Sequence, residues 1–138
     1  MKKLKKSFKK DHTSIIIPLY NEELRLDYCF DIDGTICSNT NGEYKNAIPR
    51  QFMIDKVNRL YDAGHRISFF SARGSTSGIN WNEFTDSQLK GWGVKFHKLM
   101  LGKPHADVYI DDKSIHPVDW IENRKMPNEE ILDHKNND

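Results

Sequence analysis

Short hydrophobic runs that stop at polar residues recur through the middle of the chain. Leu26–Asp31 is a hydrophobic-rich run that predicts a buried strand, and His65–Phe70 predicts a second one. Val94–Leu101 contains a third strand, and Ala106–Ile110 is expected to form a fourth. The segments that separate the first three runs have a different, helical periodicity.

Two segments have apolar residues at helical spacing. Pro49 is expected to open the first helix, and Gly64 to follow its end. Asn80 is the expected N-cap of the second helix, which Gly91 or Gly93 terminates. The expected apolar faces are Met53, Val57, Leu60 and Tyr61 in the first helix, and Trp81, Phe84, Gln88 and Trp92 in the second. Strands alternating with helices predict an α/β domain with a parallel sheet.

This alternation places one domain between two tails. Residues 24–121 are expected to form a Rossmann-like three-layer α/β domain around a central parallel sheet. Residues 1–23 are expected to form a basic N-terminal tail in which Ile15–Leu19 is an edge strand or a docked arm, and residues 122–138 a polar C-terminal tail. The polar stretch Ile36–Ile48 is expected to be a loop or a small flap.

Polar residues occupy the strand ends of this predicted sheet. Asp31, Ser71 and Asp111 each stand where a hydrophobic strand stops, and Lys103 lies in the loop before the last strand. The carboxyl ends of parallel strands share one edge of the sheet, where ligands bind. These four residues, far apart in the sequence, are therefore expected to converge.

Composition and charge narrow the class of protein. A chain of 138 residues with 37% hydrophobic and 30% charged residues is typical of one soluble globular domain. Six lysines fall within the first ten residues, which leaves 15 Lys and Arg against 20 Asp and Glu, a net charge of −5, on the remainder. An acidic body argues against a nucleic-acid-binding surface on the fold.

No segment resembles a signal peptide or reaches transmembrane length, which predicts a cytoplasmic protein without stable membrane insertion. Cys29 and Cys37 fit no metal spacing, so both are expected to be free thiols in a reducing compartment.

Four motifs in order resemble those of the haloacid dehalogenase (HAD) superfamily of phosphotransferases. Asp31-Ile32-Asp33-Gly34-Thr35 follows a strand, as the first motif does, and Ser71 closes a hydrophobic strand, as the second does. Lys103 matches the third motif, and Asp111-Asp112 matches the fourth. The resemblance covers roughly residues 25 to 120 and leaves no room for a cap domain.

The resemblance implies a phosphatase, that is, a phosphoric monoester hydrolase, that depends on Mg²⁺. Asp31 would be the nucleophile that forms an aspartyl-phosphate, and Asp33 the general acid and base. Ser71 and Lys103 would hold the phosphoryl oxygens, and Thr35 is a further candidate for substrate binding. Arg73, next to Ser71, is expected either to touch the substrate or to be a surface residue. The expected metal ligands are the carboxylates of Asp31 and Asp111, with Asp112 as a further candidate, and the backbone carbonyl of Asp33. A proton-carrying Asp33 favours phosphoryl transfer over dehalogenation, because a halide leaves without a proton.

Other interpretations compete with this one. Asp-x-Asp-Gly is often only a turn, Asp111-Asp112 could be a solvated strand end, and Lys103-Pro104 a surface loop. Ser14–Glu22 resembles the first strand of a nucleotide-sugar glycosyltransferase, but the chain is too short for that enzyme and Asp31 follows too soon. The chain could also be a phosphatase of proteins or nucleotides, or a non-catalytic binding module of the same fold.

The substrate expectation rests on a second resemblance. Lys103–Asp112 is similar to small HAD proteins of capsule and surface-polysaccharide synthesis, which suggests a small sugar or polyol phosphate. Without a cap, water must be excluded by the flap, a tail or a neighbouring subunit, so homo-oligomerisation is left open.

Overall fold

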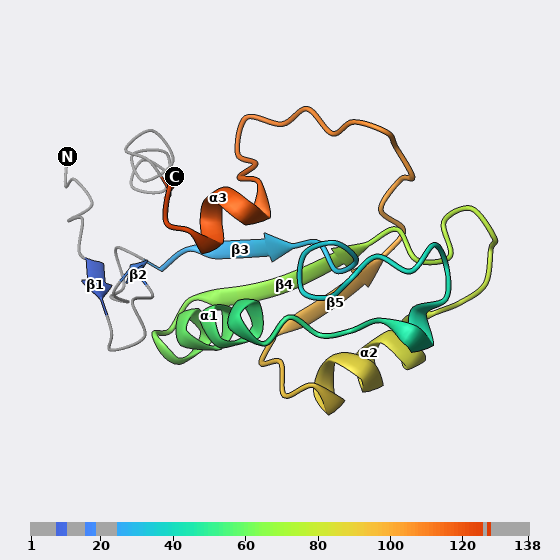
Figure 1. The fold of residues 1–138 in the computed structure, drawn as a ribbon, viewed down its shortest axis with the longest axis horizontal. Coiled ribbons are helices and arrows are strands. Elements are labelled where there is room, and N and C mark those ends of the chain that lie inside the picture. The colour runs from blue at the N-terminus through green and yellow to red at the C-terminus, as the bar shows by residue number, and fades with distance from the viewer. Residues whose placement is uncertain (1–7, 11–15, 19–24, 126, 128–138) are drawn as a thin grey trace.

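The chain has an α/β fold built on a small parallel sheet. The computed structural model describes residues 8–10, 16–18, 25–125 and 127. The sheet consists of β3 (Asp27–Phe30), β4 (Arg66–Ser71) and β5 (Lys98–Leu101), with β4 in the centre (Figure 1). Both neighbouring pairs are parallel, and the register places Phe30 opposite Phe69 and Leu101 opposite Ser71.

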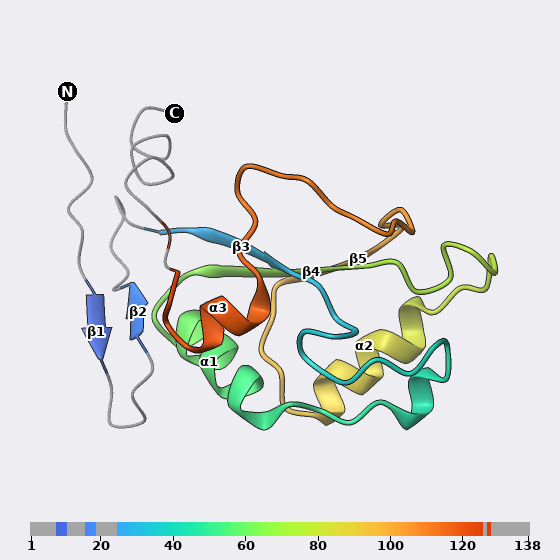
Figure 2. The same cartoon turned by 45° about the horizontal axis from the view of Figure 1, so that its top comes forward.

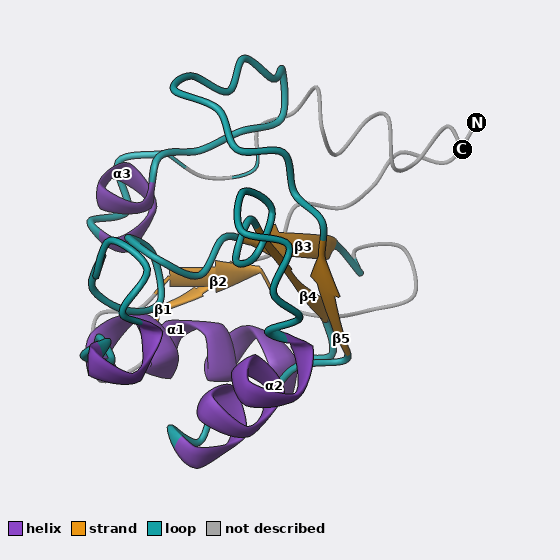
Figure 3. Ribbon diagram, turned by 90° about the vertical axis from the view of Figure 1, so that its right-hand side faces the viewer, coloured by secondary structure: helices purple, strands orange, loops and turns teal. Residues whose placement is uncertain are grey.

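Three helices cover one face of this sheet. They are α1 (Gln51–Asp62), α2 (Asn82–Gly91) and the short α3 (Pro117–Ile121), and Figures 2 and 3 draw all three on the same side. Ile67 and Phe69 of β4 are fully buried in one cluster with Val57 of α1, Leu89 of α2 and Trp120 of α3. The described residues therefore form two layers rather than the three that we expected.

The opposite face of the sheet is polar or only partly covered by the described residues. The register places Cys29, Ser68 and Lys98 side by side on this face, followed by Phe70 and Met100. Cys29 and Lys98 are exposed, whereas Ser68, Phe70 and Met100 are partly buried. Parallel sheets are usually covered on both faces, so this half-covered sheet is unusual.

Both long helices end in the same way, and the ends set the start of the next strand. After α1, the N–H of His65 donates to the carbonyl of Leu60 at 3.1 Å, and Gly64 adopts a positive φ of 96°. After α2, Gly93 has a φ of 77° and the N–H of Val94 donates to Leu89 at 3.0 Å. This double hydrogen-bond arrangement is the Schellman motif, which needs a residue that tolerates the left-handed region. Gly64 follows the first helix, as expected. Of the two glycines expected to end the second helix, Gly91 and Gly93, it is Gly93 that follows its last turn.

The predicted fourth strand is wrong. Residues 102–116 form a long irregular segment that arches on the β3 side of the sheet between β5 and α3 (Figure 1). Within it, the side chains of Val108 and Ile110 are 70% and 95% exposed. The segment Ala106–Ile110 thus pairs with no strand among the described residues, although its apolar pattern is typical of a buried strand.

The second helix buries a different face from the expected one. Thr85 and Leu89 are its buried residues, whereas Phe84 is 37% exposed and packs its ring edge-on against Trp81. The expected flap contains only a 3-10 turn at Tyr44–Asn46. Between β4 and β5 the described residues form one helix and no further domain.

A two-stranded antiparallel sheet precedes the domain. It pairs β1 (Phe8–Lys10) with β2 (Ile16–Pro18), so the strand expected at Ile15–Leu19 pairs with β1 and not with the central sheet. Ser14, Leu19–Glu22 and the lysines at positions 2, 3, 5 and 6 lie outside the described residues. No helix in the described part of the chain has the length and apolarity needed to span a membrane.

Lys56 connects α1 to the end of α3 inside the core. Its side chain is 1% exposed, and its ammonium donates to the carbonyl oxygen of Trp120 and, at 3.0 Å, to Oδ1 of Asn123. The same nitrogen lies 4.1 Å from the centre of the Trp120 ring. Burial lowers the pKa of Lys56 from 10.5 to about 8.

This shift predicts a pH dependence of stability. Below pH 8 Lys56 is charged in both states, and the cost of burying the charge is fully present. Between pH 8 and 10.5 the folded state releases the proton while the unfolded state keeps it, so the free energy of unfolding rises with pH. Relative to Lys56→Met, the wild type should gain on the order of 2 kcal/mol across this interval, measured by urea denaturation.

The matched control is Lys98→Met, because Lys98 is exposed and its substitution removes a lysine without touching the core. If the free energy of unfolding depended on pH in the same way for the wild type and for Lys56→Met, the Lys56 ammonium would not be desolvated in the folded protein.

Candidate active site

The carboxyl edge of the sheet gathers the residues that end its strands. Asp31 directly follows β3, Ser71 is the last residue of β4, and Lys103 comes two residues after β5. Because the strands are parallel, these ends lie at the same edge. The N–H of Lys103 donates to the carbonyl of Ser71 at 3.1 Å, and the Ser75 hydroxyl donates to the carbonyl of Lys103 at 2.7 Å. Lys103 is thereby held above β4.

Asp31 and Lys103 form an ion pair at this edge. The Lys103 ammonium lies 3.4 Å from Oδ1 of Asp31, and their side chains are 20% and 39% exposed, respectively. Burial raises the pKa of Asp31, and the charge of Lys103 opposes this rise without cancelling it. The negative charge on Asp31 therefore costs free energy in the folded protein. It lies beside a cation that could bind an anionic ligand at the same place.

Ser71 and Thr35 lie deeper than the ion pair. Ser71 is 1% exposed, and its hydroxyl oxygen accepts the N–H of Arg73 at 3.1 Å. This leaves the hydroxyl proton of Ser71 to a further acceptor. Thr35 is 7% exposed, and its N–H donates to the carbonyl of Ile32 at 3.0 Å, which closes the tight turn after Asp31. Gly34 in that turn has a φ of 85° and its carbonyl accepts from Arg50 at 2.7 Å.

Asp33 is held by Arg73 through two parallel hydrogen bonds. Nε of Arg73 lies 2.9 Å from Oδ2 of Asp33, and Nη2 lies 2.9 Å from Oδ1. The Arg73 side chain is fully buried and that of Asp33 is 22% exposed. Such bidentate pairs fix orientation as well as charge. Asp33 is thus turned toward the inside of the domain, and both of its oxygens act as acceptors.

Arg73 departs from its expected role. We expected it either to touch the substrate or to be a surface residue, but its guanidinium is buried and also donates to Thr85 at 3.2 Å and to Gln88 at 2.7 Å. Its charge stacks 4.5 Å from the ring centre of Tyr44 in the flap. Gln88 in turn donates to the Tyr44 carbonyl at 2.7 Å. Arg73 therefore connects the Asp33 turn, α2 and the flap, and no sequence motif indicated Gln88 or Tyr44.

Cys37 also contacts this cluster. Its thiol lies 3.6 Å from Oδ1 of Asp33 and 3.7 Å from the carbonyl of Ile32. Burial raises the pKa of Cys37 to about 12, with the negative charge of Asp33 acting in the same direction. Cys37 is consequently a thiol at neutral pH and not a nucleophile. Both cysteines are free, as expected.

Asp111 and Asp112 are not brought to the site. Both are exposed and lie in the arching segment 102–116 rather than at the end of a strand. A backbone hydrogen bond from Lys113 to the Asp111 carboxylate lowers the pKa of Asp111. Across the described part of the chain, no three His, Cys, Asp or Glu residues lie close enough to share a metal ion. The expected convergence therefore holds for Asp31, Ser71 and Lys103 and fails for Asp111.

A Mg²⁺ ion is poorly matched by this set of groups. Magnesium takes carboxylate, carbonyl and water oxygens in octahedral geometry. Only Asp31 presents a carboxylate at the edge, and it faces the Lys103 ammonium, whereas both carboxylate oxygens of Asp33 are engaged by Arg73, so that Asp33 could contribute only its backbone carbonyl, the atom expected from the sequence. As placed within one chain, the described residues do not form a magnesium site.

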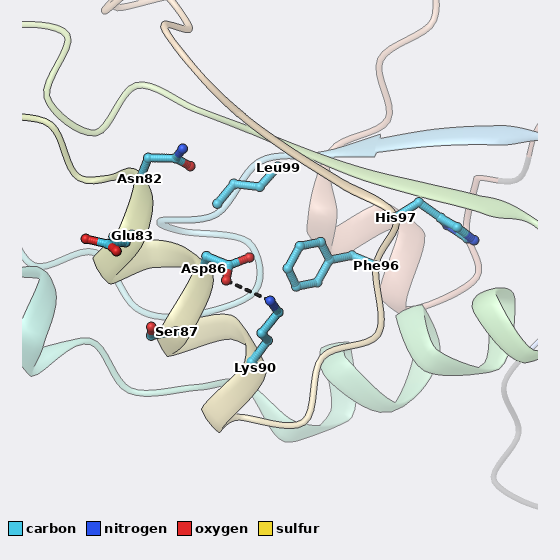
Figure 4. Close-up of a pocket in the computed structure, with 8 residues that line it drawn as sticks. All are labelled: Asn82, Glu83, Asp86, Ser87, Lys90, Phe96, His97 and Leu99. Carbon is cyan, nitrogen blue, oxygen red and sulfur yellow. Dashed lines mark ion pairs between the residues drawn. The ribbon is translucent and has the colours of Figure 1, made fainter.

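An open surface depression of about 600 Å³ lies elsewhere, between α2 and residues 96–99 (Figure 4). Lys90 and Asp86 form an ion pair at 2.8 Å across its α2 side, and Phe96 and Leu99 form its apolar side. None of the site residues that were expected from the sequence lines this depression. We therefore assign it no part in the site.

The buried pair predicts a strong energetic coupling between Arg73 and Asp33. Arg73→Lys loses the two-pronged contact and should lower the free energy of unfolding by about 3 kcal/mol. Combined with Asp33→Asn, it should cost less than the sum of the two single changes, with a coupling of at least ~1 kcal/mol in urea denaturation. The matched control is Arg124→Lys, whose ion pairs are solvent-exposed and should change stability by under about 1 kcal/mol. Additive effects of Arg73→Lys and Asp33→Asn would contradict the pairing.

Comparison with known proteins gives the fold but no activity. No protein-family model matches the chain, and no curated protein matches it. Among solved structures, a chain of the Pnkp1/Rnl/Hen1 complex is 15% identical with a TM-score of 0.48, over 74% of this chain and 36% of that one. The crystal structure of an MCSG target protein from Vibrio cholerae is 25% identical with a TM-score of 0.65, over 81% of this chain and 98% of that one. The second likeness spans about four fifths of this chain and nearly the whole of the Vibrio cholerae protein, and it agrees with the α/β fold described above.

Proposed function

We propose that the chain is a phosphoric monoester hydrolase of the HAD type, with Asp31 as its nucleophile. The observation that carries the proposal is the ion pair between Asp31 and Lys103 beside Ser71, three residues from three successive parallel strands. An attacking carboxylate needs a cation nearby, because the phosphate ester is itself an anion. Lys103 supplies this charge 3.4 Å from the carboxylate.

The chemistry proceeds in two displacements. In the first, an Asp31 oxygen bonds to phosphorus, the ester P–O bond breaks, and the leaving alkoxide takes a proton. In the second, water attacks the aspartyl-phosphate, gives up a proton, and releases inorganic phosphate and the Asp31 carboxylate. Lys103 and the Ser71 hydroxyl proton stabilise the phosphoryl oxygens in both steps.

Asp33 is the group that we propose to carry the proton between the two steps. When one Asp33 carboxylate oxygen is protonated, the hydrogen bond that it accepts from Arg73 has to break, because both oxygens accept from Arg73 in the structure. Arg73 is then a positioning residue, which holds the Asp33 carboxylate at the end of the Asp31 turn and does not touch the substrate. The proposed cofactor is Mg²⁺, and the carboxylates of one chain do not assemble its site.

The proposed substrate class is a small sugar or polyol phosphate used in surface-polysaccharide synthesis, from the resemblance of Lys103–Asp112 to proteins of that process. Among the described residues no cap domain interrupts the fold, so this proposal assigns size selection to other parts of the protein. A cytoplasmic location is part of this proposal. The alternative is a non-catalytic binding module of the same fold, which the dispersed carboxylates favour.

Phosphate release tests the proposal. A panel of sugar, polyol, amino-alcohol and nucleotide phosphates is incubated with the protein in Mg²⁺ and in EDTA, and inorganic phosphate is measured. Asp31→Asn should lower kcat by at least ~10³-fold, because it removes the attacking oxygen. Asp27→Asn is the matched control, since Asp27 lies at the other end of the same strand and should leave the rate unchanged.

Two outcomes would contradict the proposal. Equal rates for Asp31→Asn and the wild type would exclude Asp31 as the nucleophile. The absence of release from every substrate by folded protein in Mg²⁺ would favour the binding module.

A further inference from the structure

Tyr109 connects the irregular segment after β5 to the candidate site. The centre of its ring lies 4.3 Å from the Lys103 ammonium, the cation that also faces Asp31 at 3.4 Å. Tyr109 is 49% exposed, whereas its neighbours Val108 and Ile110 are 70% and 95% exposed. Of these three neighbouring residues, Tyr109 is therefore the one that the segment turns toward the lysine.

The same tyrosine closes the chain after Lys103 into a loop. The Tyr109 hydroxyl donates to the carbonyl of Pro104, the residue that follows Lys103. The backbone of Lys103 is itself held at the carboxyl edge of the sheet, because its N–H donates to Ser71 and its carbonyl accepts from Ser75. The ring and the hydroxyl of Tyr109 thus both return to the place where the lysine backbone is anchored.

The Lys103 ammonium needs more than one contact to stay in place. The lysine side chain is long and flexible, so holding it in one conformation costs rotamer entropy. The Asp31 side chain is 39% exposed, and ion pairs between exposed groups hold long side chains weakly. The face of an aromatic ring attracts an ammonium electrostatically, and this attraction grows where water is excluded. The Tyr109 ring is the second contact that restricts the ammonium to the neighbourhood of Asp31.

We propose that Tyr109 is a positioning residue, whose ring holds the Lys103 ammonium beside Asp31 to meet the phosphoryl group of the substrate. Tyr109 acts only through Lys103 and does not touch the reacting atoms. The effect on the reaction rests on the proposed function, whereas the placement of the ammonium by the ring does not.

An uncharged ring suits this place better than a second carboxylate would. A phosphate monoester is an anion, and the Asp31 carboxylate already brings a negative charge to it. A second carboxylate beside Lys103 would hold the ammonium but would also repel the phosphoryl group. The ring holds the ammonium through its quadrupole and adds no net charge. The cation is thereby ordered without a loss of affinity for an anion.

Proton NMR tests the placement of the ammonium without any reference to catalysis. Protons above the face of an aromatic ring resonate upfield, so the ε-methylene protons of Lys103 should be shifted upfield in the folded protein. Lys103→Met identifies this signal, because it removes it. Tyr109→Phe should keep the shift, and Tyr109→Leu should abolish it. An unshifted Lys103 signal in the wild type, or a shift that persists in Tyr109→Leu, would overturn the proposal.

A mutant cycle in urea denaturation measures the same contact as a free energy. Tyr109→Leu and Lys103→Met each remove the contact between ring and ammonium, so the double variant should lose less stability than the sum of the two single variants. The matched control pairs Val108→Ala with Lys103→Met, and these two changes should be additive, because Val108 is largely exposed. Additive effects of Tyr109→Leu and Lys103→Met would count against the contact.

Rates of phosphate release then test the effect on the reaction, with the best phosphomonoester of the panel as the probe. Tyr109→Leu should lower kcat/KM about fivefold to tenfold, because the ammonium is no longer held in place. Tyr109→Phe should stay within about threefold of the wild type, since it keeps the ring and loses only the hydrogen bond to Pro104. Val108→Ala should leave kcat/KM unchanged.

The outcomes separate this proposal from the proposed function. A normal kcat/KM for Tyr109→Leu, with its Lys103 signal no longer shifted, would show that the ring holds the ammonium without serving the reaction, and would reject the positioning role. Equal losses in Tyr109→Phe and Tyr109→Leu would assign the effect to the hydroxyl and not to the ring. If the wild type released no phosphate but kept the shifted Lys103 signal, the proposed function would fail and the placement of the ammonium would stand.

Discussion

The parallel register of β3, β4 and β5 is the constraint on which the candidate site depends. Ile67 and Phe69 of β4 are fully buried on the helix-covered face, and a slip of one residue would turn both toward the other face. The same register fixes the level of Ser71 and of the turn that begins at Asp31. Lys103 then reaches Asp31 because its backbone is bonded to Ser71. The burial of Ile67 and Phe69 thus sets, through the strand register, the distance between Asp31 and Lys103.

The contacts of Arg73 hold the residues around the site in place, whereas the buried charge of Asp31 costs stability. Arg73, whose side chain is fully buried, joins the Asp33 turn and α2 through hydrogen bonds and the flap through a cation–π contact with Tyr44. Asp31, by contrast, is a carboxylate whose pKa is raised by its burial, so the folded protein would be more stable without its charge. Groups that destabilise the fold and face a cation at a sheet edge are typical of functional sites.

The sequence predicted those parts that depend on local chemistry. Strands ending at Phe30, Ser71 and Leu101, and helices stopped by Gly64 and Gly93, follow from apolar spacing and from glycine's tolerance of positive φ. The partners of Arg73 could not be predicted, because Tyr44 and Gln88 meet it only after the flap and α2 have packed. The segment at 106–110 has the pattern of a strand, but a pattern does not state whether the connection is long enough to pair it within one chain. The separation of only eight residues between Lys103 and Asp111 was the available signal.

The central claim is that Asp31 attacks phosphorus, and a covalent intermediate tests it most directly. The protein would be mixed with its best substrate, quenched in acid within milliseconds, and its peptides examined by mass spectrometry for an acyl phosphate. The account predicts a phosphoryl group on the peptide that contains Asp31 and none on the same peptide from Asp31→Asn. Turnover with the phosphoryl group on another residue, or with none at any quench time, would contradict it.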